Sequence, residues 1–366
     1  MTDDTASPPA PPEPVYPVLA HWARLGLTHA EPLAGGLINL TVLARARDGA
    51  AYVLQRLHPI FRAEVNEDID ALTAHLADRG VPTARLVPTD QGARCVEAEG
   101  VWRLMTYLPG RTYPRVPSPR VAREAGALLG RFHRALADLA HDFRFRRAAH
   151  GLALHGEALR RALAAHPGHR LHAEVAALGA ELLARAASVP PVDRLPPRIT
   201  HGDPKITNVL FHPDDRAHAL IDLDTLGHLP LPLELGDALR SWCNPAGEDG
   251  GPPELDLGLL AAALEGYGQA AGAWLTDDEA EGLVPGLLYI TLELATRFAA
   301  DALNESYFGW NADRFPASGE HQLHRARVQA ALARSVTDHL AAARTTARQA
   351  LGRRADARDD ARRDDP

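Results

Sequence analysis

Residues 200–224 read THGDPKITNVLFHPDDRAHALIDLD, and this stretch decides how the rest of the chain is interpreted. Asp203 is followed at the fifth position by Asn208, and two short apolar runs then lead to Asp222. The runs, at 209–211 and 219–221, flank a Pro-Asp-Asp turn and predict a β-hairpin. The return of the hairpin would bring Asp222 back to the vicinity of Asn208.

The order of these polar groups is typical of phosphoryl transfer. That reaction needs an aspartate beside the acceptor hydroxyl, an asparagine and a second aspartate on a metal ion, and a cation on the phosphates. Protein kinases carry the same Asp-x-x-x-x-Asn loop before a hairpin that ends in a metal-binding aspartate. A lone His-Gly-Asp is more often a turn, so the prediction depends on the whole set.

Outward from this stretch, the chain divides into two regions of different character. We expect a disordered tail at 1–14, a β-rich nucleotide lobe at 15–107, a helical lobe with the catalytic loop and acceptor site at 108–348, and a charged tail at 349–366. In the first lobe we expect helices at 15–27 and 63–79 and strands near 40–43, 52–54, 84–87, 94–98 and 101–107. The second lobe is predicted to be helical at 121–139, onward to 187, and at 235–348. The expected fold class is α+β, a protein-kinase-like bilobal fold.

Composition limits the classes of partner and compartment. The 366 residues are 46% hydrophobic, which is ample for a core, and the formal net charge of -8 argues against nucleic acid as the main partner. No continuous apolar run approaches a membrane span, and the acidic, Pro-rich start lacks the features of a secretory signal. Two isolated cysteines, Cys95 and Cys243, fit a reducing cytoplasm and are expected to be buried. The oligomeric state stays open.

One lysine stands among 39 basic residues, and it lies inside the polar loop. A genome rich in G and C would favour arginine codons and leave Lys205 by chance. However, a lysine delivers a compact charge where a planar guanidinium would not fit, so Lys205 is also a candidate for phosphate contact.

With these motifs in place, the chain resembles the aminoglycoside phosphotransferase/choline kinase-like superfamily. Within it, the chain is most similar to the N-acetylhexosamine 1-kinase group. The segments that carry the resemblance span nearly the whole ordered chain: GLINLT at 36–41, YVLQR at 52–56, HGDPKITN at 201–208, IDLDT at 221–225, GDALR at 236–240 and TRFAAD at 296–301.

The resemblance implies an ATP- and Mg²⁺-dependent kinase. Asp203 would be the catalytic base or would orient the acceptor hydroxyl, and Lys205 would approach the transferred phosphate. Asn208 and Asp222 would bind Mg²⁺, while Asp224 would be either a further ligand or a stabiliser of its loop.

The chain departs from the kinase pattern at one position. Kinases place a lysine on the third strand of the small lobe to hold the α- and β-phosphates, and no lysine occurs there. Arg56 is the best replacement, with Glu67 on the next helix as its partner. Gln55 could equally face the cleft, and the sequence does not decide between them.

Other nucleotide contacts are expected from backbone. Gly35 and Gly36 lack side chains and would let amides approach a phosphate, although many hairpin turns look the same. A hinge at 104–108, with Met105 and Tyr107, would bind adenine through backbone groups.

The acceptor site is the least determined part. Candidate residues are Asp237, Arg240, Arg297, Asp301 and Tyr307, and Arg297 with Asp301 could equally form a surface ion pair one helical turn apart. The acceptor is expected to be a hydroxyl of a sugar, an N-acetylhexosamine or related hexose. Homoserine, choline or an aminoglycoside are alternatives within the superfamily, and a nucleotide-binding pseudokinase is an alternative outside catalysis.

Overall fold

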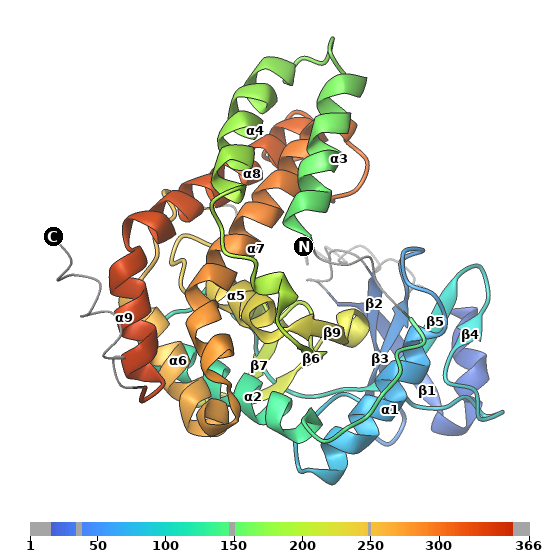
Figure 1. The fold of residues 1–366 in the computed structure, drawn as a ribbon. Coiled ribbons are helices and arrows are strands. Elements are labelled where there is room, and N and C mark those ends of the chain that lie inside the picture. The colour runs from blue at the N-terminus through green and yellow to red at the C-terminus, as the bar shows by residue number, and fades with distance from the viewer. Residues whose placement is uncertain (1–15, 34–38, 146–150, 248–249, 354–366) are drawn as a thin grey trace, which may run out of the picture. The chain divides into compact units, whose positions relative to one another are not determined.

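The computed structural model describes residues 16–33, 39–145, 151–247 and 250–353. The chain splits into two compact units: the residues up to Ala71 with Ala84–Leu108, and Leu72–Thr83 with the residues from Pro109 onward. Figure 1 shows the strands of the first unit and the helices of the second. The fold is α+β, as predicted. The assignment of Leu72–Thr83 to the second unit is a feature that the sequence does not indicate.

A five-stranded antiparallel sheet forms the first unit. Its spatial order is β1 (Leu27–Pro32), β2 (Leu40–Ala46), β3 (Ala51–Arg56), β5 (Val101–Thr106) and β4 (Val96–Glu97). The β2–β3 turn forms where an Asp-Gly pair predicts it, since Gly49 has φ +89° and the Asp48 side chain accepts a hydrogen bond from the Ala50 amide. Pairing without offset along β2, β3 and β5 fixes which side chains share a face.

One face of this sheet is covered by the N-terminal helix η1 (Pro17–Leu25), a 3₁₀ helix. The apolar cluster between them contains Val18, Trp22, Val42, Leu54, Trp102 and Leu104, among others. The Trp22 indole donates to the Val87 carbonyl at 2.7 Å, which satisfies the only polar atom of this fully buried side chain. Alternation along the strands therefore sends residues 54 and 56 toward η1, and residues 53 and 55 to the other face.

Two of the strands that we expected in this unit, at 84–87 and 94–98, differ from the observed structure. Residues 84–87 form no strand; they join β5 through the single bridge of Leu86 to Met105 and two backbone hydrogen bonds. Pro88 ends this contact, because proline has no N–H for a ladder. Residues 94–98 shrink to the two residues of β4. The helix expected at 63–79 is α1 (Val65–Asp78), followed by Gly80 at φ +70°.

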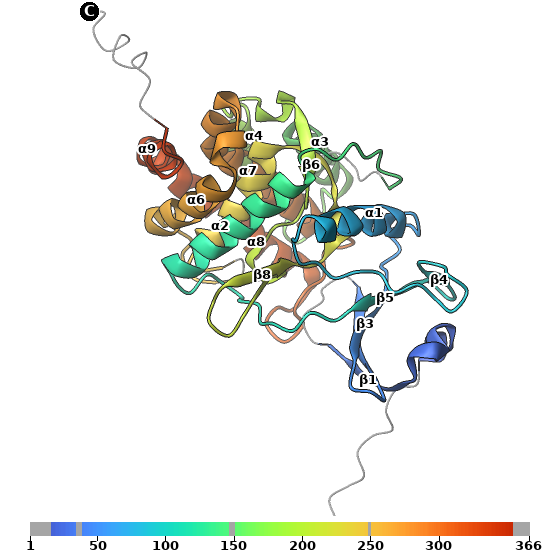
Figure 2. The same cartoon turned by 90° about the horizontal axis from the view of Figure 1, so that it is seen from below.

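The second unit is built from helices and two short β-ladders (Figure 2). β6 (Pro197–Thr200) pairs with β9 (Gly227–Pro230), and β7 (Val209–Phe211) pairs with β8 (Ala217–Leu220). The helices are α2 (Pro119–Leu136), α3 (Leu152–Ala165), α4 (His172–Ala186), α5 (Leu231–Trp242), α6 (Leu257–Ala271), α7 (Asp277–Asn304), α8 (Ser318–Asp338) and α9 (Leu340–Ala350).

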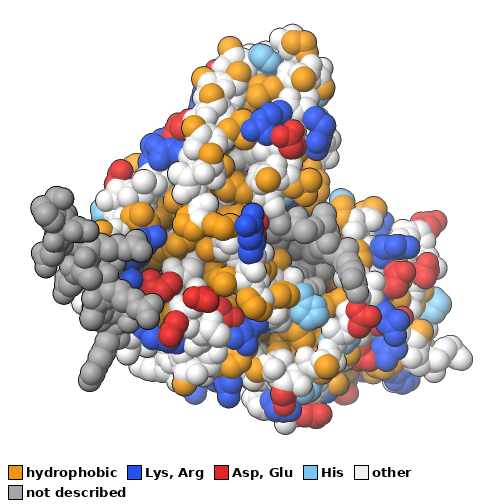
Figure 3. All heavy atoms as spheres, viewed as in Figure 1, with side chains coloured by type: hydrophobic (Ala, Val, Ile, Leu, Met, Phe, Trp, Pro, Cys, Tyr) orange, Lys and Arg blue, Asp and Glu red, His pale blue; other side chains and the backbone are white. Residues whose placement is uncertain are grey.

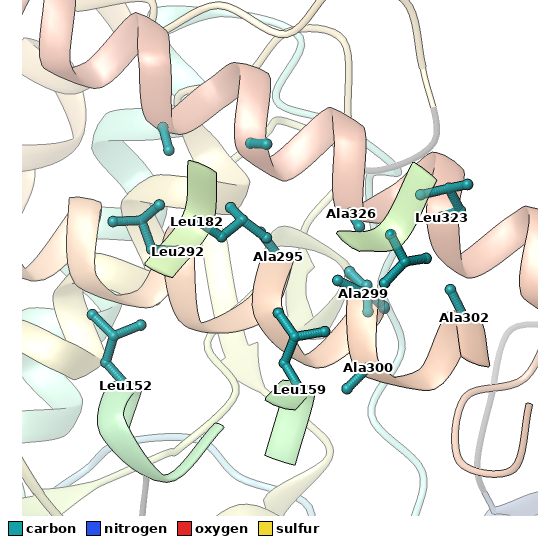
Figure 4. Packing of buried hydrophobic residues seen from close by; sticks show 14 of the residues in the cluster. Leu152, Leu159, Leu182, Leu292, Ala295, Ala299, Ala300, Ala302, Leu323 and Ala326 are labelled. Carbon is teal, nitrogen blue, oxygen red and sulfur yellow. The ribbon is translucent and has the colours of Figure 1, made fainter. Parts of the chain in front are cut away.

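Leucine and alanine side chains from α3, α4, α7 and α8 pack together in one core cluster of this unit (Figure 4). The alanines of α7, such as Ala295 and Ala299, are fully buried and let neighbouring helices approach closely. Within the described ranges, α7 alone is long and apolar enough to cross a membrane, but 83% of its most apolar window is buried in the protein. We therefore interpret α7 as the central core helix.

The crossing of α5 and α7 depends on two glycines. A Cβ on Gly236 would lie 2.5 Å from the backbone of Gly286, and one on Gly286 would lie 2.0 Å from the Pro232 carbonyl oxygen. No side chain fits at such distances, so the two backbones touch directly. This close packing fixes α5, the helix that supports the candidate site.

Acidic and basic side chains are interspersed on the face shown in Figure 3, without a large area of one sign. Cys243 is buried, whereas Cys95 is only half-buried, so the expectation that both are buried was correct for one.

Candidate active site

The predicted catalytic loop follows β6 and ends in the 3₁₀ turn η3 (Ile206–Asn208). Gly202 makes its first bend at φ +81°, in the left-handed region. A Cβ at this position would lie 2.1 Å from the Thr225 carbonyl oxygen, so both the conformation and the space require glycine. The Thr225 hydroxyl in turn donates to the His201 carbonyl at 2.8 Å. The loop is thereby fastened to the segment that follows the β7–β8 hairpin.

Three side chains of helix α5 form hydrogen bonds with the backbone of the loop. The buried Glu234 carboxylate accepts hydrogen bonds from the His201 and Gly202 amides, each at 2.9 Å. About two helical turns further along α5, the Ser241 hydroxyl accepts from the Ile206 amide at 3.0 Å, and the Trp242 indole donates to the Pro204 carbonyl at 2.9 Å. Backbone groups that would otherwise be buried without partners are satisfied in this way.

His201 is fully buried and joins the loop to the hairpin. Its Nδ1 accepts from the Asp203 amide at 3.3 Å, so the proton sits on Nε2, which donates to the Ile221 carbonyl at 2.9 Å. The His201 ring therefore connects the Asp203 backbone to the Ile221 carbonyl, the residue before Asp222.

Asp203, Lys205 and Asn208 are brought together by the loop itself. The Lys205 ammonium donates to Asp203 Oδ2 at 2.6 Å, and the Asn208 amide donates to the same oxygen at 3.2 Å and to the Asp203 carbonyl at 2.9 Å. Burial raises the pKa of Asp203, but the charge and hydrogen bond of Lys205 outweigh it, and the net pKa lies below the ordinary value. Asp203 is thus held as a carboxylate.

The β7–β8 hairpin returns Asp222 to this group, as the spacing predicts. The Ile221 amide donates to the Asn208 carbonyl at 3.0 Å, which ties the two ends of the hairpin together. Asp222 adopts a left-handed conformation, φ +65°, and Asp224 is fully buried in the next turn, η4 (Leu223–Thr225). The pKa of Asp222 is raised to about 6 by its dense surroundings and then by the Asp224 and Asp203 carboxylates. Because Asp222 is exposed, the charges of the two neighbouring carboxylates affect its pKa more than burial does.

The donor set suits a divalent cation of the Mg²⁺ type. Mutual repulsion among Asp203, Asp222 and Asp224 would be relieved by a positive ion, and carboxylate and amide oxygens are the ligands Mg²⁺ prefers. Over the described part of the chain, no group of three or more His, Cys, Asp or Glu side chains forms a ready-made metal cage.

Of the five candidate acceptor residues, two lie beside the catalytic loop. Arg240 on α5 donates to Asp237 at 2.8 Å, with both side chains mostly buried, and the Arg240 charge helps to lower the pKa of Asp203. These two residues form what we call the Asp237–Arg240 pair.

The other three gather at the end of α7. The Asp301 carboxylate accepts from the Ser306, Tyr307 and Phe308 amides at 2.9–3.1 Å, which gives it a structural role in closing the helix. Arg297 stacks over Tyr307 and Phe308, at 5.8 and 5.4 Å from the ring centroids. The observed contacts of Asp301 are thus with backbone amides after α7.

In the first unit, the predicted nucleotide residues divide between the two faces of the sheet. Arg56 lies exposed on the η1 side, where its guanidinium sits 5.7 Å from the Trp102 ring centroid. Gln55 lies on the other face, with Met105 two positions along on the same side. Tyr107 follows β5 and is half-buried. Gly35 and Gly36 lie outside the described residues.

Glu67, the predicted partner acid of Arg56, lies on α1. Glu67 is exposed on the first turn of α1, where its charge acts on Arg94 and Cys95. The neighbouring Asn66 is buried instead and contacts Arg103. The pairing of Arg56 with Glu67 stays a prediction.

The residue that sequence reasoning missed is Glu234. Its signal was a single acid among apolar residues in Leu-Pro-Leu-Glu-Leu, where a charge inside an apolar run indicates a buried partner. Its carboxylate lies 3.5 Å from His133 Nε2, and His133 Nδ1 contacts the Tyr267 hydroxyl at 3.0 Å. Burial raises the pKa of Glu234, but His133, His201 and the loop amides outweigh it and lower the net pKa.

Comparison with known proteins matches this geometry to one family. The model of the "Phosphotransferase enzyme family" matches residues 29–276. Among solved structures, an aminoglycoside phosphotransferase from Alicyclobacillus acidocaldarius has a TM-score of 0.60 at 17% identity, covering 92% of this chain and 97% of its own.

Two further structures show the same fold. An amicoumacin kinase, in complex with AMP-PNP, Ca²⁺ and its antibiotic, has a TM-score of 0.54 at 16% identity, with 84% of this chain and 89% of that chain covered. An ethanolamine kinase from Plasmodium vivax has a TM-score of 0.56 at 10% identity, with 83% and 82% covered.

Proposed function

Because the chain belongs to the phosphotransferase enzyme family, we propose that it transfers the γ-phosphate of ATP, with Mg²⁺, to a hydroxyl of a neutral sugar, an N-acetylhexosamine or related hexose. Family membership gives a small-molecule phosphotransferase with a hydroxyl acceptor. The nucleotide, the metal and the sugar are the proposed part. The amicoumacin kinase with AMP-PNP and Ca²⁺ supports the use of a nucleotide and a divalent ion by analogy.

Asp203 would orient the acceptor hydroxyl and accept its proton late in the reaction. A carboxylate whose pKa is lowered by Lys205 is a weak base, so it fixes the direction of attack more than it activates the nucleophile. This suits phosphoryl transfer, in which the transition state is loose and positioning supplies most of the catalysis.

Lys205 would exchange its partner during the cycle. Its ammonium is bound to Asp203 at 2.6 Å, yet about a quarter of the side chain is accessible, 27%, so phosphate oxygens can compete for it. Asn208 and Asp222, with Asp224 behind them, would hold the divalent ion, which offsets phosphate charge when bound. In this proposal, Asp203 would lie next to both the cation and the metal ligands, since Lys205 and Asn208 both donate to its Oδ2 atom.

The observation that carries the sugar assignment is the Asp237–Arg240 pair. A cationic acceptor such as choline or an aminoglycoside requires uncompensated carboxylates near the catalytic loop. Asp203, Asp222 and Asp224 are assigned to the reaction and the metal. The two acids of α5 are paired, Asp237 with Arg240 at 2.8 Å and Glu234 with the loop amides. A paired acid and base still offers donors and acceptors to hydroxyl groups, which is what a neutral sugar needs.

A screen of the purified chain tests this proposal. ATP consumption would be measured with N-acetylhexosamines, hexoses, homoserine, choline and aminoglycosides, with the Asp203→Asn variant run in parallel. We expect turnover with a neutral sugar and a loss of about a thousandfold in kcat for Asp203→Asn. Turnover only with cationic acceptors would overturn the sugar assignment, and undiminished activity of Asp203→Asn would overturn the mechanism. Nucleotide binding without turnover on any acceptor would favour the pseudokinase alternative.

A further inference from the structure

Two histidines face one another on the β7–β8 hairpin. The ladder continues past the end of β7, where the His212 amide donates to the Arg216 carbonyl at 2.9 Å. His218 on β8 comes two positions after Arg216, so it is the diagonal cross-strand neighbour of His212. Such neighbours project from the same face, and long side chains can span the distance between them. The two imidazole rings accordingly meet, with centroids 4.3 Å apart and planes tilted by 42°.

The ring nitrogens of this pair are not used elsewhere. In the same unit, the rings of His172 and His201 take part in hydrogen bonds to backbone carbonyls. Over the described residues, no hydrogen bond or ion pair occupies a ring nitrogen of His212 or His218, and both side chains are half-buried. Burial lowers the pKa of His218, and His212 lowers it further. His218 is therefore neutral near pH 7 and keeps a nitrogen lone pair that can bind a cation.

The spacing of the two rings suits two bonds to one metal ion. Imidazole nitrogens bind Zn²⁺ at about 2.0–2.1 Å, so two of them lie about 3.3 Å apart in a tetrahedral site. Rings with centroids 4.3 Å apart can reach that separation by rotation about their side-chain bonds. Imidazole suits Zn²⁺, Cu²⁺ and Ni²⁺, whereas carboxylate oxygens suit Mg²⁺.

The turn that joins the two strands carries a balanced pair of charges. Asp214 binds the Arg216 guanidinium at 2.7 Å, and its side chain is 53% exposed. The pKa of Asp214 is lowered first by this hydrogen bond and more weakly by His212, so its carboxylate lies within electrostatic reach of the histidines. Because Arg216 already occupies this carboxylate, water would complete the coordination of an ion between the rings.

We propose that His212 and His218 form a binding site for a divalent transition metal of the Zn²⁺ class, with water at the remaining positions. The site is separate from the carboxylates of the proposed reaction, because His218 comes four residues before Asp222, about 13 Å along an extended chain. A bound ion joins the two strands near their turn, and the hydrogen bond from the Ile221 amide to the Asn208 carbonyl joins them at the other end. Binding therefore stabilises the hairpin that places Asp222.

Metal titration of the full chain, without nucleotide or acceptor, tests the proposal. Calorimetry would follow Zn²⁺ binding in excess Mg²⁺, which occupies sites built from carboxylates. We expect one Zn²⁺ per chain in the tightest class of sites. His212→Gln and His218→Gln should each bind it about tenfold to a hundredfold more weakly, because a single imidazole loses the gain of two ligands on one scaffold. For the same reason, the double variant should bind little more weakly than either single variant. The matched control is His58→Gln, an exposed histidine of the first unit, which should keep the wild-type affinity.

Thermal unfolding gives an independent measurement. Because Zn²⁺ binds the folded hairpin, we expect it to raise the melting temperature of the wild type by a few degrees and to leave both single variants unchanged. Without metal, the wild type and the variants should unfold at similar temperatures, since neither ring makes a hydrogen bond among the described residues. Equal Zn²⁺ affinity in wild type and variants would show an adventitious ion only. Zn²⁺ that binds only when Mg²⁺ is left out would lie at the carboxylates. Either result overturns the proposal and leaves the kinase assignment intact.

Discussion

Replacing Glu234 by Gln should disable the catalytic loop without touching a substrate. The carboxylate accepts two backbone hydrogen bonds at 2.9 Å in a buried site. A glutamine has one acceptor oxygen, so one amide of the loop would face an NH₂ group instead. Hydrogen bonds to a charged group contribute about 1.5–3 kcal/mol each, and an unsatisfied buried N–H costs about 1–3 kcal/mol. The expected loss of stability is therefore about 3–5 kcal/mol, a large share of the total for most proteins.

The assay must separate the loss of stability from the loss of loop geometry. Below the melting temperature of the variant, we expect kcat to fall about a hundredfold, since displacing a catalytic group by about 1 Å can have that effect. The affinity for AMP-PNP should change little. The control is Glu279→Gln, which removes a buried carboxylate that binds Arg198 on β6 and the Thr276 amide at the start of α7, but none of the loop amides. Similar kcat values for the two variants, at similar stability loss, would refute a specific role for Glu234.

The pH dependence of stability gives a second test of the role of Glu234. Its pKa is lowered in the folded protein, so its contribution is fully present above the unfolded glutamate value, near 4.5, and is lost as pH falls through the folded value. The difference in melting temperature between wild type and Glu234→Gln should accordingly be constant from pH 8 to pH 5 and narrow below about pH 4.5. A difference that widens with acid would contradict this assignment of charge.

Three further changes have defined outcomes. Gly202→Ala should lower stability by about 3 kcal/mol or more and abolish turnover, because a Cβ would meet the Thr225 carbonyl at 2.1 Å; melting temperature and kcat check this. Lys205→Met should shift the acid limb of the kcat/KM profile to higher pH, since burial raises the pKa of Asp203 and only the weaker effects of His201 and Arg240 would then oppose it; an unshifted limb would contradict the pairing. Arg240→Met should lower stability by about 1–3 kcal/mol by removing the 2.8 Å ion pair with the partly buried Asp237, and should raise the KM for the acceptor more than that for ATP.

The catalytic loop was predictable because its information is local. Asp203 and Asn208 come directly before one β-hairpin and Asp222 comes directly after it, so the pairing of its two strands brings them together. Glu234 was not found, because its partners are backbone amides more than thirty positions away. Any residue type has such amides, so no pair of residues in the sequence marks the contact.

For the predicted nucleotide-binding residues, the sequence could not decide which face of the sheet each side chain occupies. Arg56 and Gln55 are adjacent, and a shift of one residue moves every side chain of a strand to the other face. Both faces of this sheet are covered or half-buried, so the alternation of apolar residues in Tyr-Val-Leu-Gln-Arg does not reveal which side η1 takes. Only the pairing of β3 with β5, which sets Gln55 opposite Arg103, decides it.

In the proposed function, helix α5 would contribute both to the catalytic loop and to the choice of acceptor. Glu234, Ser241 and Trp242 hold the catalytic loop, and the Asp237–Arg240 pair lies between them on the same twelve residues. Because α5 is pressed against α7 at Gly236, it cannot shift to suit a different acceptor without moving the loop. A change of specificity at Asp237 or Arg240 must therefore act through the side chains alone. Substitutions that alter the charge of this pair should change the acceptor and weaken the fold together, so new specificities would need compensating stability elsewhere in the second unit.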